Sequence, residues 1–265
     1  MRSIWKGTIN FMVMTIPSKA YKATEDSRVP LHNVHSVCGS RLEQPKWCPV
    51  CECKVEATEI VKGYGDEALT IITDTDMQAL PLKSVRQIDV VQFVDIAQVD
   101  VRAFDECYYI GVDMGDGKKK SPNMRTVAVY NLLMRAMEKA GLVAIGKWSY
   151  RDKEHLAVLR PFDGVMLLQT LHYAEEIRDY GEVVVKGTEP SEKEMELALM
   201  LVERMKGAFD LTQYRNDYRE ALEKLIEAKL AGVEATAPVA EAQAPVEDVA
   251  DALMKSIELV GASKA

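Results

Sequence analysis

The sequence predicts an α+β protein rich in β-structure, in which a β-barrel is decorated by helices. Three observations lead to this fold class. Apolar and polar side chains alternate over residues 4–13, as in a half-buried strand. Three further strand patterns follow one another between residues 142 and 173. After Gly187 the periodicity becomes that of helices.

The first barrel strands are predicted near the N-terminus. In residues 4–13, Lys6, Thr8 and Asn10 stand on the polar face of the strand. A basic loop or edge strand is expected between Pro17 and Pro30, because proline has no N–H to donate inside a sheet. Further along the chain, strand patterns cover residues 59–64, 68–72, 85–94 and 107–112.

A long helix separates these strands from a second group. Apolar side chains recur at helical spacing over residues 124–140, and Gly141 suits the left-handed position that ends a helix. Polar or glycine-containing turns then divide the next strand patterns, which predicts an antiparallel meander over residues 142–150, 155–160 and 165–173.

The C-terminal part is predicted to be helical. Ser191 and Glu194 form a capping box for a helix with an apolar stripe, and a second helix over 216–231 completes a helical arm of residues 191–231. Residues 232–246, rich in Ala, Pro and Glu, predict a flexible linker. Residues 247–265 predict a short amphipathic helix with the stripe Val249, Leu253, Ile257 and Val260. Such a helix either docks into a partner's groove or packs back on its own chain.

Length, composition and charge limit the possible classes of protein. The chain has 265 residues, 48% of them apolar, which is enough for one large domain or two small ones. No window of 18 apolar residues exists and the first residues do not resemble a signal peptide, so we expect a cytoplasmic protein without a membrane partner. The net charge of −8 argues against nucleic acid as a partner. However, residues 1–62 hold nine Lys or Arg against six acidic residues, so a local basic face remains compatible with DNA.

Four of the five cysteines lie within sixteen residues. His35 and Cys38 are separated by two residues, and so are Cys48 and Cys51; this spacing lets consecutive ligands meet on one tetrahedral zinc ion. Gly39 favours a tight turn after the first pair, whereas Glu52 stands where a glycine is expected after the second. Cys53 is an alternative ligand. The sequence therefore predicts a structural zinc, with a strand pair carrying free, reduced thiols as the other interpretation.

Two other motifs have simple structural explanations. Asp74 and Asp76 have the spacing of a divalent-metal pair, but a helix that Thr73 or Asp74 caps explains them more simply. The loop of Lys118, Lys119 and Lys120 is either a solvated turn or a phosphate contact.

Several segments, in order and nearly end to end, resemble the bacterial Ku family of non-homologous end joining. They are residues 4–9 (IWKGTI), 23–26 (ATED), 59–64 (EIVKGY), 144–147 (AIGK), 153–161 (KEHLAVLRP) and 170–179 (TLHYAEEIRD). The resemblance implies a Ku-type β-barrel whose bridging β-arm helps to form a dimeric ring, with residues 1–231 as the Ku core. It implies sequence-independent binding of double-stranded DNA ends, no catalytic residue, no required cofactor and a location at the nucleoid.

The resemblance also suggests which residues carry each role. The bridge over the DNA corresponds to residues 37–80, here called the bridge segment, and its cations are the leading DNA contacts: Arg41, Lys46, Lys54 and Lys62. Weaker DNA contacts are Lys6, Lys19, Arg28, Lys147 and Arg151, because single charges on strands are usually solvated. The helical arm would embrace a second copy of the chain. The C-terminal stripe resembles the motif by which the family recruits the ATP-dependent DNA ligase D.

One departure from the family concerns the C-terminus. Many members end in a lysine-rich tail, whereas residues 232–265 contain two lysines against six acidic residues. The acidic net charge keeps open a rival interpretation, a zinc-ribbon adaptor that binds only protein partners. A third interpretation, a nuclease or lyase, depends on Asp74, Asp76 and the lysine loop alone.

Overall fold

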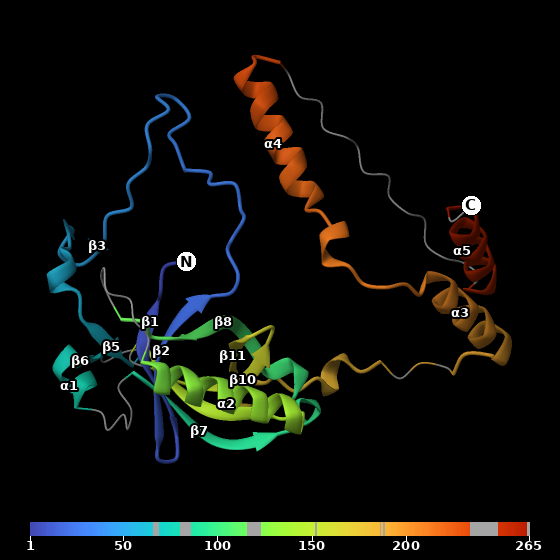
Figure 1. Cartoon of the computed structure of the whole chain (residues 1–265). Helices are drawn as coiled ribbons and strands as arrows, with labels where there is room; N and C mark the ends of the chain where they lie inside the picture. The colour runs from blue at the N-terminus through green and yellow to red at the C-terminus, as the bar shows by residue number, and fades with distance from the viewer. Residues whose placement is uncertain are drawn as a thin grey trace. The chain divides into compact units, whose positions relative to one another are not determined.

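The computed structural model describes residues 1–65, 69–79, 86–115, 123–151, 153–185, 187, 189–233 and 249–263 (Figure 1). The chain divides into two compact units. The first comprises Met1–Asp26 with His32–Asp179, and the second comprises Ser27–Leu31 with Tyr180–Ala265. The α+β fold class predicted from the sequence is confirmed. The predicted lysine loop at 118–120 and most of the predicted linker at 232–246 lie outside the described residues.

The first unit contains a closed barrel in the order β1-β2-β8-β11-β10-β9-β7. Its strands are β1 (Trp5–Phe11), β2 (Met14–Lys22), β7 (Gln87–Val94), β8 (Phe104–Val112), β9 (Val143–Tyr150), β10 (Lys153–Phe162) and β11 (Val165–Leu171). Neighbouring strands are antiparallel except β1 and β7, whose parallel pairing over Thr8–Asn10 closes the barrel. The predicted meander is confirmed, because β9, β10 and β11 pair in sequence order.

The region between Pro17 and Pro30 differs from the prediction in its first part. Residues up to Lys22 form β2, which is an inner strand with a partner on each side rather than a loop or an edge. The ladder to β8 begins at Ser18, one residue after Pro17. Pro17 therefore needs no N–H for that ladder, and its carbonyl accepts a hydrogen bond from the Asp113 amide at 2.9 Å.

Helix α2 (Met124–Ala140) packs against the barrel, as its periodicity and the Gly141 C-cap at φ 67° predicted. Tyr130 ties it to two strands: its hydroxyl donates to the Ile110 carbonyl at 2.6 Å and accepts from the Met166 amide at 2.8 Å. Inside the barrel, the fully buried Trp148 meets Tyr108 edge-on at a centroid distance of 4.9 Å. The buried face of α2 and the barrel interior thus share one hydrophobic core.

Gly146 lets strands β7 and β9 approach closely. A Cβ atom at this position would stand 2.8 Å from the main-chain oxygen of Asp89, which is closer than real Cβ atoms come. The close approach of the β7 backbone to β9 at this position therefore needs a residue without a side chain.

The bridge segment is built from short elements. They are β3 (Trp47–Cys48), β4 (Cys53–Lys54), β5 (Lys62–Tyr64), β6 (Thr70–Ile72) and α1 (Asp74–Gln78). Figure 1 labels β3, β5, β6 and α1 as small separate pieces. None of the described residues between 37 and 79 is buried. The predicted cap of α1 is confirmed, because the Thr73 hydroxyl accepts from the Asp76 amide. The Asp76 carboxylate accepts from Thr73 in return, so this pair forms a capping box.

Helices α3 (Glu192–Met205), α4 (Asp217–Leu230) and α5 (Val249–Ser263) form the second unit. The capping box is present, since the Ser191 amide donates to Glu194 Oε2 at 2.7 Å, and Asn216 caps α4. Helix α5 packs on α3. Of the helices that can be described, none combines the length and apolar character needed to cross a membrane.

Short 3₁₀ helices connect several of these elements. Their bounds are Ala57–Glu59, Ile96–Gln98, Val101–Ala103, Ala174–Glu176, Gly181–Val183 and Leu211–Gln213. The first of them occupies the start of the strand predicted over residues 59–64, so that β5 is shorter than expected.

Candidate DNA interface and cysteine knuckles

The four leading cations of the bridge segment are exposed. Arg41 lies in an isolated bridge with Val34, Lys46 precedes β3, Lys54 lies in β4, and Lys62 begins β5. Within the described part of the chain, none of the four forms an ion pair. Their charges are therefore available to solution, as phosphate contacts require.

Lys6 and Lys19 of the barrel have a different environment. They face each other across the β1–β2 ladder, and both hold Asp113, at 3.1 Å for Lys6 and 2.9 Å for Lys19. The side chains of Lys19 and Asp113 are only 13% and 10% exposed. Hydrogen bonding from Lys19 is the main reason that the pKa of Asp113 is lowered. This cluster holds strand ends together and leaves Lys19 little access to a ligand.

The other weaker candidates are also engaged. Lys147 Nζ lies 2.7 Å from Glu154 Oε1, a contact that raises the pKa of Lys147. The Arg151 guanidinium lies 5.0 Å from the ring centroid of Tyr150, in a cation–π contact. Arg28 is exposed but belongs to the second compact unit. Of the five weaker candidates, Lys6, Lys19 and Lys147 are therefore held by carboxylates and Arg151 by an aromatic ring.

The residues of the first predicted knuckle form a tight turn. His35 Nδ1 lies 3.2 Å from Cys38 Sγ, the Gly39 amide donates to the His35 carbonyl at 2.8 Å, and Gly39 has the predicted left-handed conformation at φ 69°. Hydrogen bonds from Ser40, followed by one from His35, lower the pKa of Cys38 to about 7. A thiol of this kind is partly thiolate at neutral pH, the form that binds metals.

The second knuckle is a two-stranded hairpin. Cys48 in β3 stands opposite Cys53 in β4, and the chain turns through Glu52, whose φ of 49° is the left-handed conformation for which glycine was expected. Backbone hydrogen bonds from Cys51, followed by Val50, lower the pKa of Cys48. The hydrogen bond with Cys48 raises the pKa of Cys51, so Cys48 is the more readily deprotonated thiol of the pair.

The structure thus forms each predicted ligand pair but does not join the pairs. Among the residues that can be described, no three His, Cys, Asp or Glu side chains are grouped as a metal site. One imidazole and three thiolates are a donor set that suits zinc. In the structure, however, these four side chains stand as two separate pairs.

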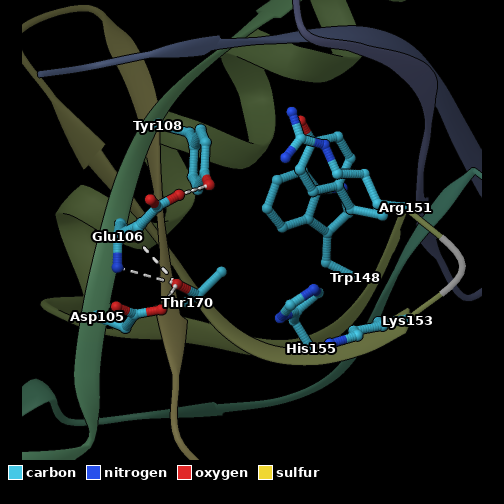
Figure 2. A pocket seen from close by; sticks show the side chains of 9 residues that line it. Asp105, Glu106, Tyr108, Trp148, Arg151, Lys153, His155 and Thr170 are labelled. Atoms are coloured by element: carbon cyan, nitrogen blue, oxygen red, sulfur yellow. Dashed lines mark hydrogen bonds between the residues drawn. The ribbon is translucent and has the colours of Figure 1, made fainter. Parts of the chain in front are cut away.

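Sequence reasoning missed a polar pocket of about 300 Å³ on the barrel. Figure 2 shows Asp105, Glu106 and Thr170 on one side, facing Arg151, Lys153 and His155 on the other. The Tyr108 hydroxyl donates to Glu106, and the Thr170 hydroxyl lies 3.2 Å from Asp105 Oδ2. Both hydroxyls are thus held in structural hydrogen bonds, and no hydrogen bond joins His155 to either of them within the described structure. Only the acidic pair Asp105-Glu106 in a strand could have drawn attention to this pocket.

The predicted partner-binding stripe lies mostly on the covered side of α5. Ile257 is 8% exposed, Leu253 and Val260 are half-buried, and Val249 is 56% exposed. Arg204 Nη1 of α3 donates to the Ile257 carbonyl at 3.2 Å. The sequence left two possibilities for this helix, and in this structure it packs on its own chain.

Comparisons with known proteins agree with the barrel. The family model described as the Ku70/Ku80 beta-barrel domain matches residues 10–197, so the fold is the Ku β-barrel. "Non-homologous end joining protein Ku" of Archaeoglobus fulgidus is 40% identical over 264 residues, which cover 98% of this chain and 100% of that protein. The proteins of that name in Symbiobacterium thermophilum and Bacillus subtilis are 37% and 31% identical; the matches cover 100% and 97% of this chain and 65% and 82% of the relatives. The chain belongs to the Ku family of non-homologous end joining proteins.

Proposed function

We propose that this chain binds the ends of double-stranded DNA, without reading their sequence, as a ring-shaped homodimer in double-strand break repair. It recruits and stimulates an ATP-dependent ligase D in non-homologous end joining. The role is that of a scaffold, with no catalytic residue. The observation that carries the proposal is the set of four exposed cations in the bridge segment of a Ku-family chain, none paired within the described residues.

A ring accounts for end binding without base recognition. Lysine and arginine side chains that line a channel touch phosphates, which are the same in every sequence. A closed ring can be threaded only where the duplex has a free end, so specificity for ends follows from topology. The acidic remainder of the chain does not oppose this, because phosphate contacts respond to local charge.

Helix α3 supports the homodimer. Its predicted apolar stripe is largely exposed, with Met195 46%, Leu199 61%, Val202 65% and Met205 65% accessible. These residues recur at helical spacing and form one uncovered apolar face, which is the kind of surface that marks an interface. In a two-fold dimer the same face of each copy would meet the partner.

The decisive experiment compares a linear duplex with the same duplex as a covalently closed circle, at two salt concentrations, in a gel-shift assay. We expect binding to the linear form only, weakening as salt rises. Equal binding to both forms would overturn the ring. Binding to neither form would favour the rival adaptor role, and a protein partner should then be sought.

Ligase recruitment is tested by deleting residues 246–265. We expect end binding to be retained and ligase stimulation to be lost, because the deletion removes the apolar stripe of α5 and none of the bridge cations. Loss of dimerisation instead would assign α5 a structural role.

A structural zinc is the second part of the proposal. His35, Cys38, Cys48 and Cys51 would hold it, with Cys53 as the alternative ligand, and the ion would draw the two knuckles together. The bridge segment has no buried residue in its described part, so a metal would supply the stiffness that a hydrophobic core supplies elsewhere. When bound, the ion would be structural and would carry no reaction.

Metal analysis of protein purified under reducing conditions tests the zinc. We expect about one zinc per chain, as one tetrahedral set of four ligands requires, and its loss when Cys48 and Cys51 are both replaced by serine. Cys107→Ser is the matched control, because Cys107 lies in β8 of the barrel. Absence of zinc from the parent protein, or its retention in the double variant, would contradict the ligand set.

A further inference from the structure

The contact between α5 and α3 has a defined register. Arg204 lies in the last turn of α3, and its guanidinium donates to the main-chain oxygen of Ile257 at 3.2 Å. Among the residues of α5 whose burial is described, Ile257 is the buried one, at 8% exposure. A charge-assisted hydrogen bond to one particular carbonyl is directional, so it selects one alignment of the two helices.

The two faces of α3 differ in what covers them. Leu197, Ala198 and Leu201 are half-buried on one face, whereas Leu199 and Val202 on the other are more than half exposed. Among the described elements, α5 is the one that packs extensively on α3. The half-buried face is therefore the one that receives α5. The exposed face of Met195, Leu199, Val202 and Met205, proposed above as the dimer interface, remains uncovered.

We propose that α3 is an intramolecular docking site for α5. In this proposal, α3 and the ligase compete for the apolar stripe of α5. The inference deepens the proposed ligase recruitment and rests on it. Leu253, Ile257 and Val260 are the stripe residues assigned to the ligase, and they are the ones covered or half-covered in this structure. The helix cannot present its buried side chain to a partner while it lies on α3.

Competition of this kind weakens recruitment by a calculable factor. The apparent dissociation constant of the ligase equals the intrinsic one divided by the fraction of chains whose α5 is free. If docked chains outnumber free ones about ten to one, the ligase binds about eleven-fold more weakly than it binds free α5. Any change on α3 that releases α5 should therefore tighten ligase binding, although α3 itself does not touch the ligase.

The experiment uses the full chain with single substitutions on α3. Arg204→Gln removes the guanidinium that holds Ile257, and Leu201→Ser weakens the apolar face. Lys206→Gln is the matched control, because it removes one cation near the same end of α3 from a pair with Glu203 whose side chains are 71% and 73% exposed. Each variant is measured by hydrogen exchange of the α5 amides and by titration with purified ligase D.

We expect the α5 amides of the parent to be protected, since an isolated helix of fifteen residues is marginal in water. Arg204→Gln should speed their exchange about five-fold, the effect of losing about 1 kcal/mol. Where docked chains predominate, ligase binding should tighten by about the same factor. Leu201→Ser should act in the same direction, and Lys206→Gln should match the parent.

Three outcomes would overturn the inference. The first is unprotected α5 amides in the parent, which would mean that α3 does not hold α5. The second is faster exchange in Arg204→Gln with unchanged ligase affinity, which would mean that the contact does not compete. The third is no ligase binding by the parent or any variant while linear DNA is still bound, which would also remove the recruitment role itself.

Discussion

Replacing the four bridge cations with glutamine should flatten the salt dependence of DNA binding without harming the fold. The changes are Arg41→Gln, Lys46→Gln, Lys54→Gln and Lys62→Gln. All four side chains are exposed, and none forms an ion pair with another described residue. The substitutions therefore remove charge and leave no buried carboxylate without a partner.

The magnitude follows from counterion release. Each phosphate contact contributes about 0.9 to the slope of log K against log salt concentration, so four contacts contribute about 3.6 per chain. Raising the salt from about 50 to about 200 mM is a four-fold change. It should reduce the ratio of the parent's DNA-binding constant to the variant's by about 150-fold per chain. A ring of two chains would make twice as many of these phosphate contacts, so their contribution to the slope would double.

The assay is a fluorescence titration of a short linear duplex at four or more salt concentrations. Single variants provide a matched pair: Lys46→Gln should lower the slope by about 0.9, whereas Lys147→Gln should lower it less, since Lys147 is already paired with Glu154 at 2.7 Å. An unchanged slope in the quadruple variant would refute the assignment of the bridge segment as the DNA contact surface. Circular dichroism would confirm that the variant is folded.

Three further predictions concern the stability of the barrel. Tyr130→Phe should lower the free energy of unfolding by about 1–3 kcal/mol in urea denaturation, because a buried carbonyl and a buried amide lose their partner; Tyr64→Phe, at a side chain 76% exposed, should not. Gly146→Ala should cost about 1–3 kcal/mol through its clash with the Asp89 carbonyl; an equal effect of Gly207→Ala, which has nothing within 4 Å, would contradict this reason. Asp113→Asn should destabilise the protein at neutral pH. The lowered pKa of Asp113 means that its contribution is present above the ordinary carboxyl pKa of about 4 and is lost as pH falls through the folded value. Thermal melts should therefore show the difference between parent and Asp113→Asn narrowing below about pH 4.

Local patterns were sufficient for the elements whose contacts lie near in sequence. Helix α2, the helix cap at Thr73, the capping box at Ser191 and the meander of β9 to β11 follow the predicted positions within a few residues. The same holds for the two knuckles, because a gap of two residues already brings His35 to Cys38 and Cys48 to Cys51. The caps and the knuckles are decided by neighbours within about four residues along the chain. The meander depends on pairing between strands that directly follow one another in sequence.

The candidate site was predictable only in part. The spacing of cysteines and the family motifs directed attention to the bridge segment, and its four cations are exposed as the prediction requires. The sequence ranked Lys19 below these four as a DNA contact, but it did not reveal the partner of Lys19, Asp113, which lies on a distant part of the chain. Whether a cation is available depends on what folding brings beside it.

By itself, the sequence determined the Ku family, the β-rich α+β class, the helices and the short-range knuckles, because these depend on local periodicity and ligand spacing. Only the tertiary structure decided that β1 closes the barrel against β7, a strand that follows it by about eighty residues. Only the tertiary structure decided that Asp113 forms ion pairs with two barrel lysines and that α5 lies on α3. These outcomes depend on contacts between distant segments, where burial and pairing outweigh any local preference.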